Sequence, residues 1–247
     1  MLAHCPIHDI DFENQPGGTR FYEHCPECQK EAKAREVSRE LERVNENMAA
    51  ELKAMNIEPE YRHATLGNFY AATSELKKNV EQVQKLIEGK IRELVMIGKN
   101  GTGKTHLAVA AVKDFRGKIF SMYEISTRIR STYTQRAKED ELSVVDELAR
   151  TPLLVIDEIG RTKGSGAELD WLSYIIDKRH VRNIPTILIS NKHLKKNCPE
   201  GGCLNCFDNY IGEDVMSRLF EDGLVLHFSG DDYRKKKAGA RLAKEHV

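Results

Sequence analysis

The feature that most constrains this chain is the stretch from Leu94 to Thr105, in which an apolar run leads directly into the pattern G-x-x-x-x-G-K-T. The apolar run predicts a buried strand, and the glycines let successive backbone amides point inward at a phosphate. Lys104 would place its charge on the β and γ phosphates of a nucleotide, and the Thr105 hydroxyl would ligate Mg²⁺. The residues expected to contact the nucleotide are Gly98, Asn100, Gly101, Thr102, Gly103, Lys104, Thr105 and His106.

A second motif, from Leu153 to Glu158, consists of four apolar residues followed by two acids. A buried strand that ends in adjacent carboxylates places them at the same edge of a parallel sheet as the phosphate loop. Asp157 would hold Mg²⁺, and Glu158 would polarise the water that attacks the γ phosphate. This Walker B pattern, about 50 residues after the loop, indicates hydrolysis of a nucleoside triphosphate rather than phosphate transfer by a kinase.

Composition narrows the class of protein. The chain has 247 residues, of which 31% are charged and 40% hydrophobic, and the 38 basic residues equal the 38 acidic ones. A net charge of zero gives no global attraction to nucleic acid, so any such contact must be local. The apolar runs are too short to cross a bilayer, and the amino end lacks a basic-then-apolar signal, so we expect a cytoplasmic protein without membrane contact.

The first of two cysteine clusters lies within residues 1–30. Cys5 and His8 are followed by Cys25 and Cys28, which gives two short chelating turns. Four such ligands fit a closed structural Zn²⁺ site, and a module this small would draw its folding energy from the metal. We therefore expect a zinc ribbon with Pro16–Gly18 at its tip; the alternative is a flexible tail with unrelated thiols.

The second cluster lies in the segment 192–209, which fits neither a helix nor a strand pattern. Its possible ligands are His193, Cys198, Cys203 and Cys206, with a Gly201-Gly202 pair that lets the chain fold back. Three thiols and an imidazole could close a second tetrahedral zinc site. The spacing is less regular than in the first cluster, and a reduced flexible loop is the alternative.

Residues 29–55 predict a long helix with a narrow apolar stripe. Apolar residues recur there every three or four positions, and Pro59 ends the segment. The stripe would pack either against a partner helix or against the chain's own domain. The expected organisation is a zinc module at 1–30, a helical linker at 31–58 and an ATPase domain at 59–247. The stripe consists of Val37, Leu41, Val44, Met48, Leu52 and Met55.

From residue 60 onward, helix and strand patterns alternate, which is typical of a parallel sheet covered on both faces. The expected strands are 93–97, 118–123, 153–157, 185–190 and 224–229. The expected helices are 74–88, 104–115, 125–149 with a break near Ala137, 167–182, 212–221 and 231–245.

Three further residues are candidates for contact with the γ phosphate because of where they lie in the predicted elements. Asn191 ends a strand, where it would contact the γ phosphate or serve only as a turn residue. Arg218 lies in a short helix and Arg234 opens the last expected helix. One arginine could reach the γ phosphate across a subunit boundary and the other within the chain, although either could also be a surface ion pair.

The order of these motifs resembles the AAA+ ATPases and, more narrowly, the helicase loaders of the DnaC, DnaI and IstB group. This resemblance covers about residues 57–247 and implies a five-stranded parallel sheet. It implies that Asn191 is sensor 1, that Arg218 is an arginine finger for self-assembly, and that Arg234 is sensor 2. It further implies a protein that binds the replicative DNA helicase and delivers it onto single-stranded DNA under the control of ATP. The stretches that carry the resemblance are Ile57–Phe69, Gly98–Leu107, Leu153–Gly160, Asp177–Arg179 and Gly212–Arg218.

Contact with DNA would use a local basic surface. Arg128, Arg130 and Tyr133 share one expected helix, in which the aromatic ring could stack a base. The resemblance adds Ser165 as a second contact position, although Ala167 replaces the neighbouring aromatic of the family. An ordinary solvated basic face is the alternative.

Two functions remain open at this point: a helicase loader, and an IstB-like transposition helper that binds DNA and a transposase. The zinc ribbon and the striped helix favour a dedicated protein partner. The neutral charge disfavours a filament on duplex DNA.

Overall fold

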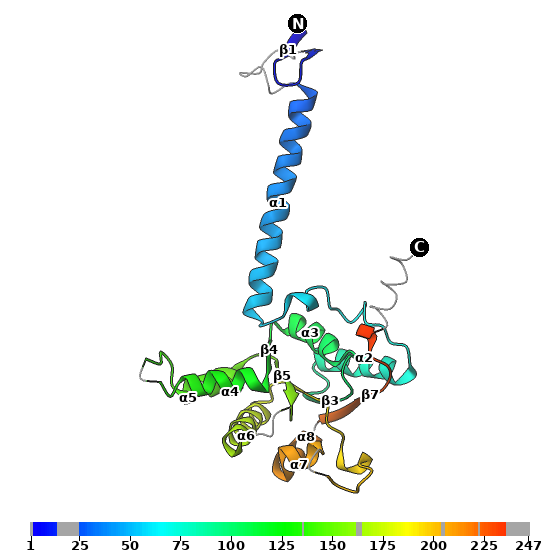
Figure 1. Cartoon of the computed structure of the whole chain (residues 1–247), viewed down its shortest axis with the longest axis vertical. Helices are drawn as coiled ribbons and strands as arrows, with labels where there is room; N and C mark the ends of the chain where they lie inside the picture. The colour runs from blue at the N-terminus through cyan, green and yellow to red at the C-terminus, as the bar shows by residue number, and fades with distance from the viewer. Residues whose placement is uncertain are drawn as a thin grey trace. The chain divides into compact units, whose positions relative to one another are not determined.

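The structure is a computed structural model that describes residues 2–13, 25–134, 136–161, 165–203, 206–221 and 223–235. The chain divides into two compact units, Met1–Glu51 and Leu52–Val247, and each is described by itself (Figure 1). The expected ribbon tip at Pro16–Gly18 and most of the expected last helix, from residue 236 on, lie outside the described residues.

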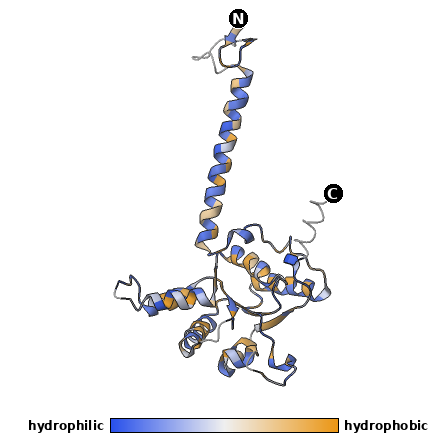
Figure 2. Ribbon diagram, in the orientation of Figure 1, coloured by the Kyte–Doolittle hydropathy of each residue, from blue (hydrophilic) through white to orange (hydrophobic). Residues whose placement is uncertain are grey.

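The first unit contains a small hairpin and a long helix. Strands β1 (Leu2–Cys5) and β2 (Ile10–Glu13) pair antiparallel. Helix α1 (Pro26–Ala54) begins three residues before the predicted start, because Pro26 has no N–H to satisfy and suits the first turn of a helix. Apart from a small cluster of Ala3, Cys5, Phe12 and Cys25, the described residues of this unit form little core. Figure 2 accordingly shows α1 as mostly hydrophilic.

The second unit is built on the predicted five-stranded parallel sheet. Its strand order is β4-β5-β6-β3-β7, and every neighbouring pair is parallel. The carboxyl ends of three central strands lie at one edge, since Ser190 pairs with both Ile97 and Ile159. The strands are β3 (Glu93–Gly98), β4 (Lys118–Ser121), β5 (Leu154–Ile159), β6 (Thr186–Ser190) and β7 (Gly223–Phe228).

Helices cover both faces of this sheet. On one face, alternate strand residues such as Val95, Ile156 and Leu188 join a core with the helices α4 to α8. On the other face lies α3, whose residues from Leu107 to Val112 are all buried. The helices, besides the short η2 (Pro59–Tyr61), are α2 (Ser74–Ile87), α3 (Lys104–Phe115), α4 (Met122–Ser131), α5 (Glu141–Arg150), α6 (Gly166–Val181), α7 (Phe207–Ile211) and α8 (Glu213–Glu221).

One prediction for this unit was wrong in its bounds, and the break predicted within a second element is wider than expected. The strand expected at 118–123 stops at Ser121, because Ser121 and Glu124 form a reciprocal capping box that starts α4. The helix expected at 125–149 is two helices, since α4 ends at Ser131 and Asp140 caps the start of α5. The break therefore spans the region around Ala137 rather than a single residue.

The segment 192–209 is irregular as expected, but it contains a short helical turn, η3 (Lys195–Asn197), and the beginning of α7. Phe207, Tyr210 and Ile211 of α7 are buried in the main core. None of the described helices has the length and apolar character needed to span a bilayer.

Candidate functional site

The phosphate loop connects β3 to α3 in the conformation that the motif predicts. Gly101 and Gly103 have positive φ angles of 75° and 95°, and α3 begins at Lys104, so the positive end of this helix points at the loop. The Lys104 Nζ donates to the carbonyl oxygens of Gly98 at 2.6 Å and Lys99 at 2.7 Å. Burial, together with the charge of Arg234, lowers the pKa of Lys104 to about 8.

The two predicted magnesium ligands are in contact. The Thr105 hydroxyl donates to Asp157 Oδ2 at 2.8 Å, although the two residues belong to α3 and β5. Burial raises the pKa of Asp157, and the hydrogen bond from Thr105 opposes that shift. A hydroxyl and a carboxylate placed side by side next to the phosphate loop fit the oxygen ligands that Mg²⁺ prefers.

A β-bulge sets the direction of the acidic pair. Strand β5 pairs with β6 at Ile156 and next at Ile159, so the register shifts at Asp157 and Glu158. Glu158 has a φ angle of 58°, in the left-handed region that L residues rarely adopt. Bulges of this kind redirect side chains at functional sites. The Glu158 carboxylate forms an ion pair with Arg161.

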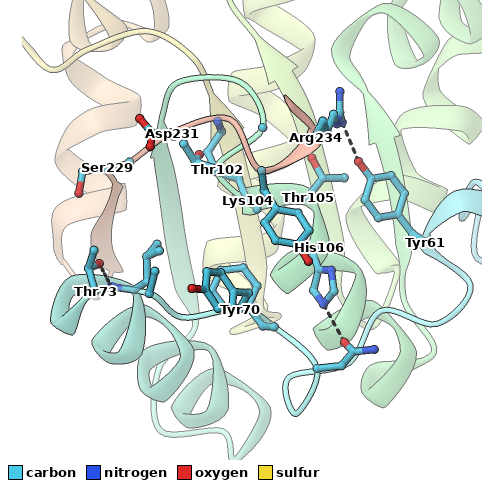
Figure 3. Close-up of a pocket in the computed structure, with 18 residues that line it drawn as sticks. Tyr61, Tyr70, Thr73, Thr102, Lys104, Thr105, His106, Ser229, Asp231 and Arg234 are labelled. Atoms are coloured by element: carbon cyan, nitrogen blue, oxygen red, sulfur yellow. Dashed lines mark hydrogen bonds between the residues drawn. The ribbon is translucent and has the colours of Figure 1, made fainter. Parts of the chain in front are cut away.

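A cavity of about 370 Å³ opens beside the phosphate loop. Figure 3 shows side chains from three parts of the chain around it: the segment before α2, the loop with the start of α3, and the segment after β7. His106 packs against Phe69 with ring centroids 5.5 Å apart. A Cβ atom on Gly103 would lie 2.4 Å from the Phe69 ring, so glycine allows the ring to approach the loop. The other aromatic residues that line the cavity are Tyr61, Tyr70 and Tyr233.

Sequence reasoning missed these aromatic residues. An apolar cavity with a few polar groups, next to a phosphate loop, fits a nucleotide base. The available signal was the aromatic content of the segment Tyr61–Tyr70, but no spacing rule connects it to the loop. His106, predicted from the loop motif, lies within 3.0 Å of the Thr65 carbonyl and of Asn68 Oδ1, so it attaches this segment to α3.

The segment after β7 closes the opposite side of the cavity. The Tyr233 amide donates to the Gly101 carbonyl at 2.9 Å, which joins this segment to the phosphate loop. Arg234 lines the cavity as the sensor 2 prediction requires, and its Nη2 donates to the Tyr61 hydroxyl at 3.0 Å (Figure 3). The structure thus brings Arg234 together with the loop residues.

Asn191 does not line the main cavity. It lies at the end of β6 in a separate hollow, together with Glu158, Arg161, Lys192 and His193. The predicted sensor 1 residue and the predicted hydrolytic acid therefore share one hollow at the sheet edge.

Arg218 lies on α8, and it lines neither the cavity beside the loop nor the hollow around Asn191. Its guanidinium forms an ion pair with Asp177 of α6.

Three of the residues predicted to contact DNA lie on or directly after α4, and each has an acidic neighbour, whereas Ser165 is the N-cap of α6. Arg128 pairs with Glu139 at 3.1 Å and also with Glu147, while the Tyr133 hydroxyl donates to Glu141 at 2.5 Å. Arg130 pairs at 3.1 Å with Glu168, which forms the capping box of α6 with Ser165. The four residues therefore form one region in which carboxylates balance the basic groups.

The first cysteine cluster has the geometry of a tetrahedral metal site. The Cys5 and Cys28 sulfurs lie 3.6 Å apart, and His8 Nδ1 lies 3.4 to 3.8 Å from the sulfurs of Cys5, Cys25 and Cys28. A tetrahedral zinc ion with ordinary bond lengths separates two sulfurs by about 3.8 Å and a sulfur from a nitrogen by about 3.6 Å. His8 Nε2 contacts Glu31 at 3.0 Å, an arrangement that orients metal-binding histidines. These residues fit zinc.

The second cluster is also brought together, as all four predicted donors lie within 4.8 Å of one another. The six cysteines of the two clusters form no disulfide.

A parallel sheet with the order β4-β5-β6-β3-β7, a phosphate loop after β3 and an acidic pair at the end of β5 define a P-loop ATPase of the AAA+ class. A family model described as "IstB-like ATP binding protein" matches residues 30–240. The chain belongs to this family, and it is an ATPase of the AAA+ type.

Individual relatives agree with this assignment. The replicative helicase loader DnaC of Escherichia coli strain K12 is 28% identical over 214 residues, which cover 81% of each protein. A putative ATP-binding protein of insertion sequence IS5376 from Geobacillus stearothermophilus is 24% identical over 149 residues, which cover 58% of this chain and 56% of that protein. A crystal structure of the DnaC helicase loader superposes with a TM-score of 0.58 and 22% identity, covering 70% of this chain and 100% of that one.

Proposed function

We propose that this ATPase loads a hexameric replicative helicase onto single-stranded DNA, with ATP controlling the release of the helicase. The observation that carries the proposal is the similarity to a replicative helicase loader over 81% of both chains. ATP would occupy the aromatic cavity, with Mg²⁺ held by Thr105 and Asp157 and the attacking water activated by Glu158. Asn191 and Arg234 would respond to the γ phosphate.

The first unit supplies a surface for the helicase. Val37, Leu41 and Val44 of α1 are 60%, 58% and 52% exposed, and they lie on one face of the helix. An exposed apolar stripe on a helix is a common docking element for a second helix. A zinc ion on Cys5, His8, Cys25 and Cys28 would hold the hairpin against the start of α1. The metal would thereby order the N-terminal end of the helix that carries this surface.

Assembly on the helicase would use Arg218. In the single chain its charge is balanced by Asp177, so reaching a γ phosphate in a neighbouring subunit requires that this ion pair open. Such an exchange of partners suits an arginine finger that acts only in the assembled state.

The test is capture of a purified hexameric replicative helicase by the full chain. We expect the triple variant Val37→Ala, Leu41→Ala and Val44→Ala to lose most of the binding, because alanine keeps the helix and removes the apolar contact. The matched control replaces three exposed residues of another face of α1, Arg39, Glu42 and Glu46, with alanine. Equal binding by both triple variants would rule out the stripe as the docking surface.

A second candidate function is supported by the similarity to the insertion-sequence protein. In that case the full chain would bind duplex DNA and a transposase, and it would not retain the helicase. Capture of the transposase in place of the helicase would overturn the loader proposal while leaving the ATPase assignment unchanged.

A further inference from the structure

Within the segment 192–209, eleven consecutive positions lie between two anchored ends. Leu194 at one end and Cys206 at the other are buried, whereas none of the described residues from Lys195 to Cys203 is buried. The described stretch from Lys195 to Cys203 buries no apolar side chain, so it gains little hydrophobic free energy to offset the entropy of ordering it. Another source of stability is therefore needed.

The side chains that converge in this segment are metal ligands. Cys203 Sγ lies 3.4 Å from His193 Nε2 and 3.9 Å from Cys206 Sγ, and the donor atom of Cys198 is within 4.8 Å of the other three. The sulfur–nitrogen and sulfur–sulfur distances of Cys203 are close to the edges of a zinc tetrahedron, which are about 3.6 Å for sulfur to nitrogen and about 3.8 Å for sulfur to sulfur.

The backbone around these ligands forms the turns that a closed metal site needs. The Cys206 amide donates to the Cys203 carbonyl at 3.1 Å, and the Gly201 amide donates to the Cys198 carbonyl at 3.1 Å. Gly201 and Gly202 have φ angles of 70° and 146°, which let the chain reverse between the second and third ligands. The Asn209 side chain donates to the Cys203 carbonyl at 2.9 Å.

We propose that His193, Cys198, Cys203 and Cys206 hold a second structural zinc ion, which fastens the segment 193–206 to the end of β6 and the start of α7. All four positions carry protein ligands, so the site is closed, as structural rather than catalytic zinc sites are. This site is independent of the helicase-loader proposal, and it holds whether or not the chain serves a helicase.

The metal would act on the region next to the catalytic edge. His193 follows Asn191 by two residues, and its carbonyl accepts the Phe207 amide at 2.8 Å. His193 and Cys206 also form a parallel β-bridge. Zinc at this place would therefore connect the chain just after β6, two residues beyond Asn191, to the start of α7, whose Phe207 is buried in the core.

Zinc content of the purified full chain provides the first test. We expect two zinc ions per chain by elemental analysis, and one in each of the variants Cys28→Ser and Cys203→Ser, because each variant removes a ligand of a different site. One zinc ion in the wild type that Cys28→Ser abolishes would overturn the proposal, as would iron in place of the second zinc.

A second test uses only the wild-type protein, so it does not depend on a variant that folds. Native alkylation followed by peptide mass analysis should show that Cys198 and Cys203 are alkylated at least tenfold more slowly before a chelator removes the metal than after. Both thiols are partly exposed, so a flexible reduced loop would react at the same rate before and after chelation, and that result would contradict a metal site. Hydrogen exchange of residues 193–206 should rise on chelation as well.

Discussion

At the scale of single residues, the site depends on groups whose chemistry is set by burial. Lys104 is buried among backbone carbonyls, and Glu158 is turned by a bulge toward the hollow that it shares with Asn191. The placement of Lys104, Thr105 and Asp157 at the phosphate loop could be predicted from the sequence, because the phosphate-loop and Walker B patterns are local. The strained φ angle of Glu158 could not, since it arises from pairing between β5 and β6.

The lowered pKa of Lys104 makes nucleotide binding depend on pH. With a pKa of about 8 in the free protein, the ammonium is mostly charged at pH 7.5 and mostly neutral at pH 9. Because a triphosphate binds the charged form, its affinity should fall by about tenfold over that interval. Titration of the chain with ATP at both pH values measures this, and Lys104→Arg, which stays charged, should lose the dependence. An unchanged affinity in the wild type would refute the assignment.

At the scale of elements, α4 and α5 are held together by charged side chains. Glu147 of α5 contacts both Arg128 and Lys118, and the ion pair with Arg128 is the larger cause that lowers the pKa of Glu147 to about 2. The signals that start these two helices were present in the sequence as Ser121-x-x-Glu124 for α4 and Asp140 for α5. The prediction of a helix over 125–149 with a break near Ala137 placed the break in the right region, but it followed the apolar periodicity and overlooked these caps.

Acid should therefore weaken this contact. The folded-state pKa of Glu147 is below its ordinary value of 4.5, so the stabilisation is fully present above about pH 4.5 and is lost as the pH falls toward 2. Wild type and Glu147→Gln should differ in free energy of unfolding at pH 6 and converge near pH 2. Urea unfolding across this range measures the difference, and a gap that stays constant with pH would contradict the role of Glu147.

Substitution of Tyr133 tests the predicted DNA surface next to α4. We expect Tyr133→Ala to weaken binding of single-stranded DNA by about five- to a hundredfold, which corresponds to the loss of one stacked base, with ATP affinity unchanged. Tyr123→Ala is the matched control, because Tyr123 lies at the start of α4 and is 64% exposed, against 62% for Tyr133, which follows the end of the same helix. Equal affinities of the two variants in a fluorescence anisotropy titration would remove Tyr133 from the surface.

At the scale of the whole molecule, the chain combines a small N-terminal unit with an AAA+ ATPase unit. The five-stranded sheet was predicted, because alternating helix and strand patterns with short connections specify a parallel sheet. The aromatic part of the cavity was not predicted, since residues 61–73 and 229–234 meet only in three dimensions. Both cysteine clusters were predicted, and their convergence in space agrees with the sequence spacing.

The central claim is that ATP binds in the aromatic cavity and is hydrolysed beside Glu158. Its most direct test is to measure ATP binding and turnover by the full chain with Mg²⁺, comparing the wild type with Glu158→Gln and Lys104→Ala. We predict that Glu158→Gln binds ATP as the wild type does but turns it over about 10²- to 10⁴-fold more slowly, and that Lys104→Ala loses binding. Full turnover by Glu158→Gln, or wild-type protein that retains no ATP at millimolar concentration, would contradict it.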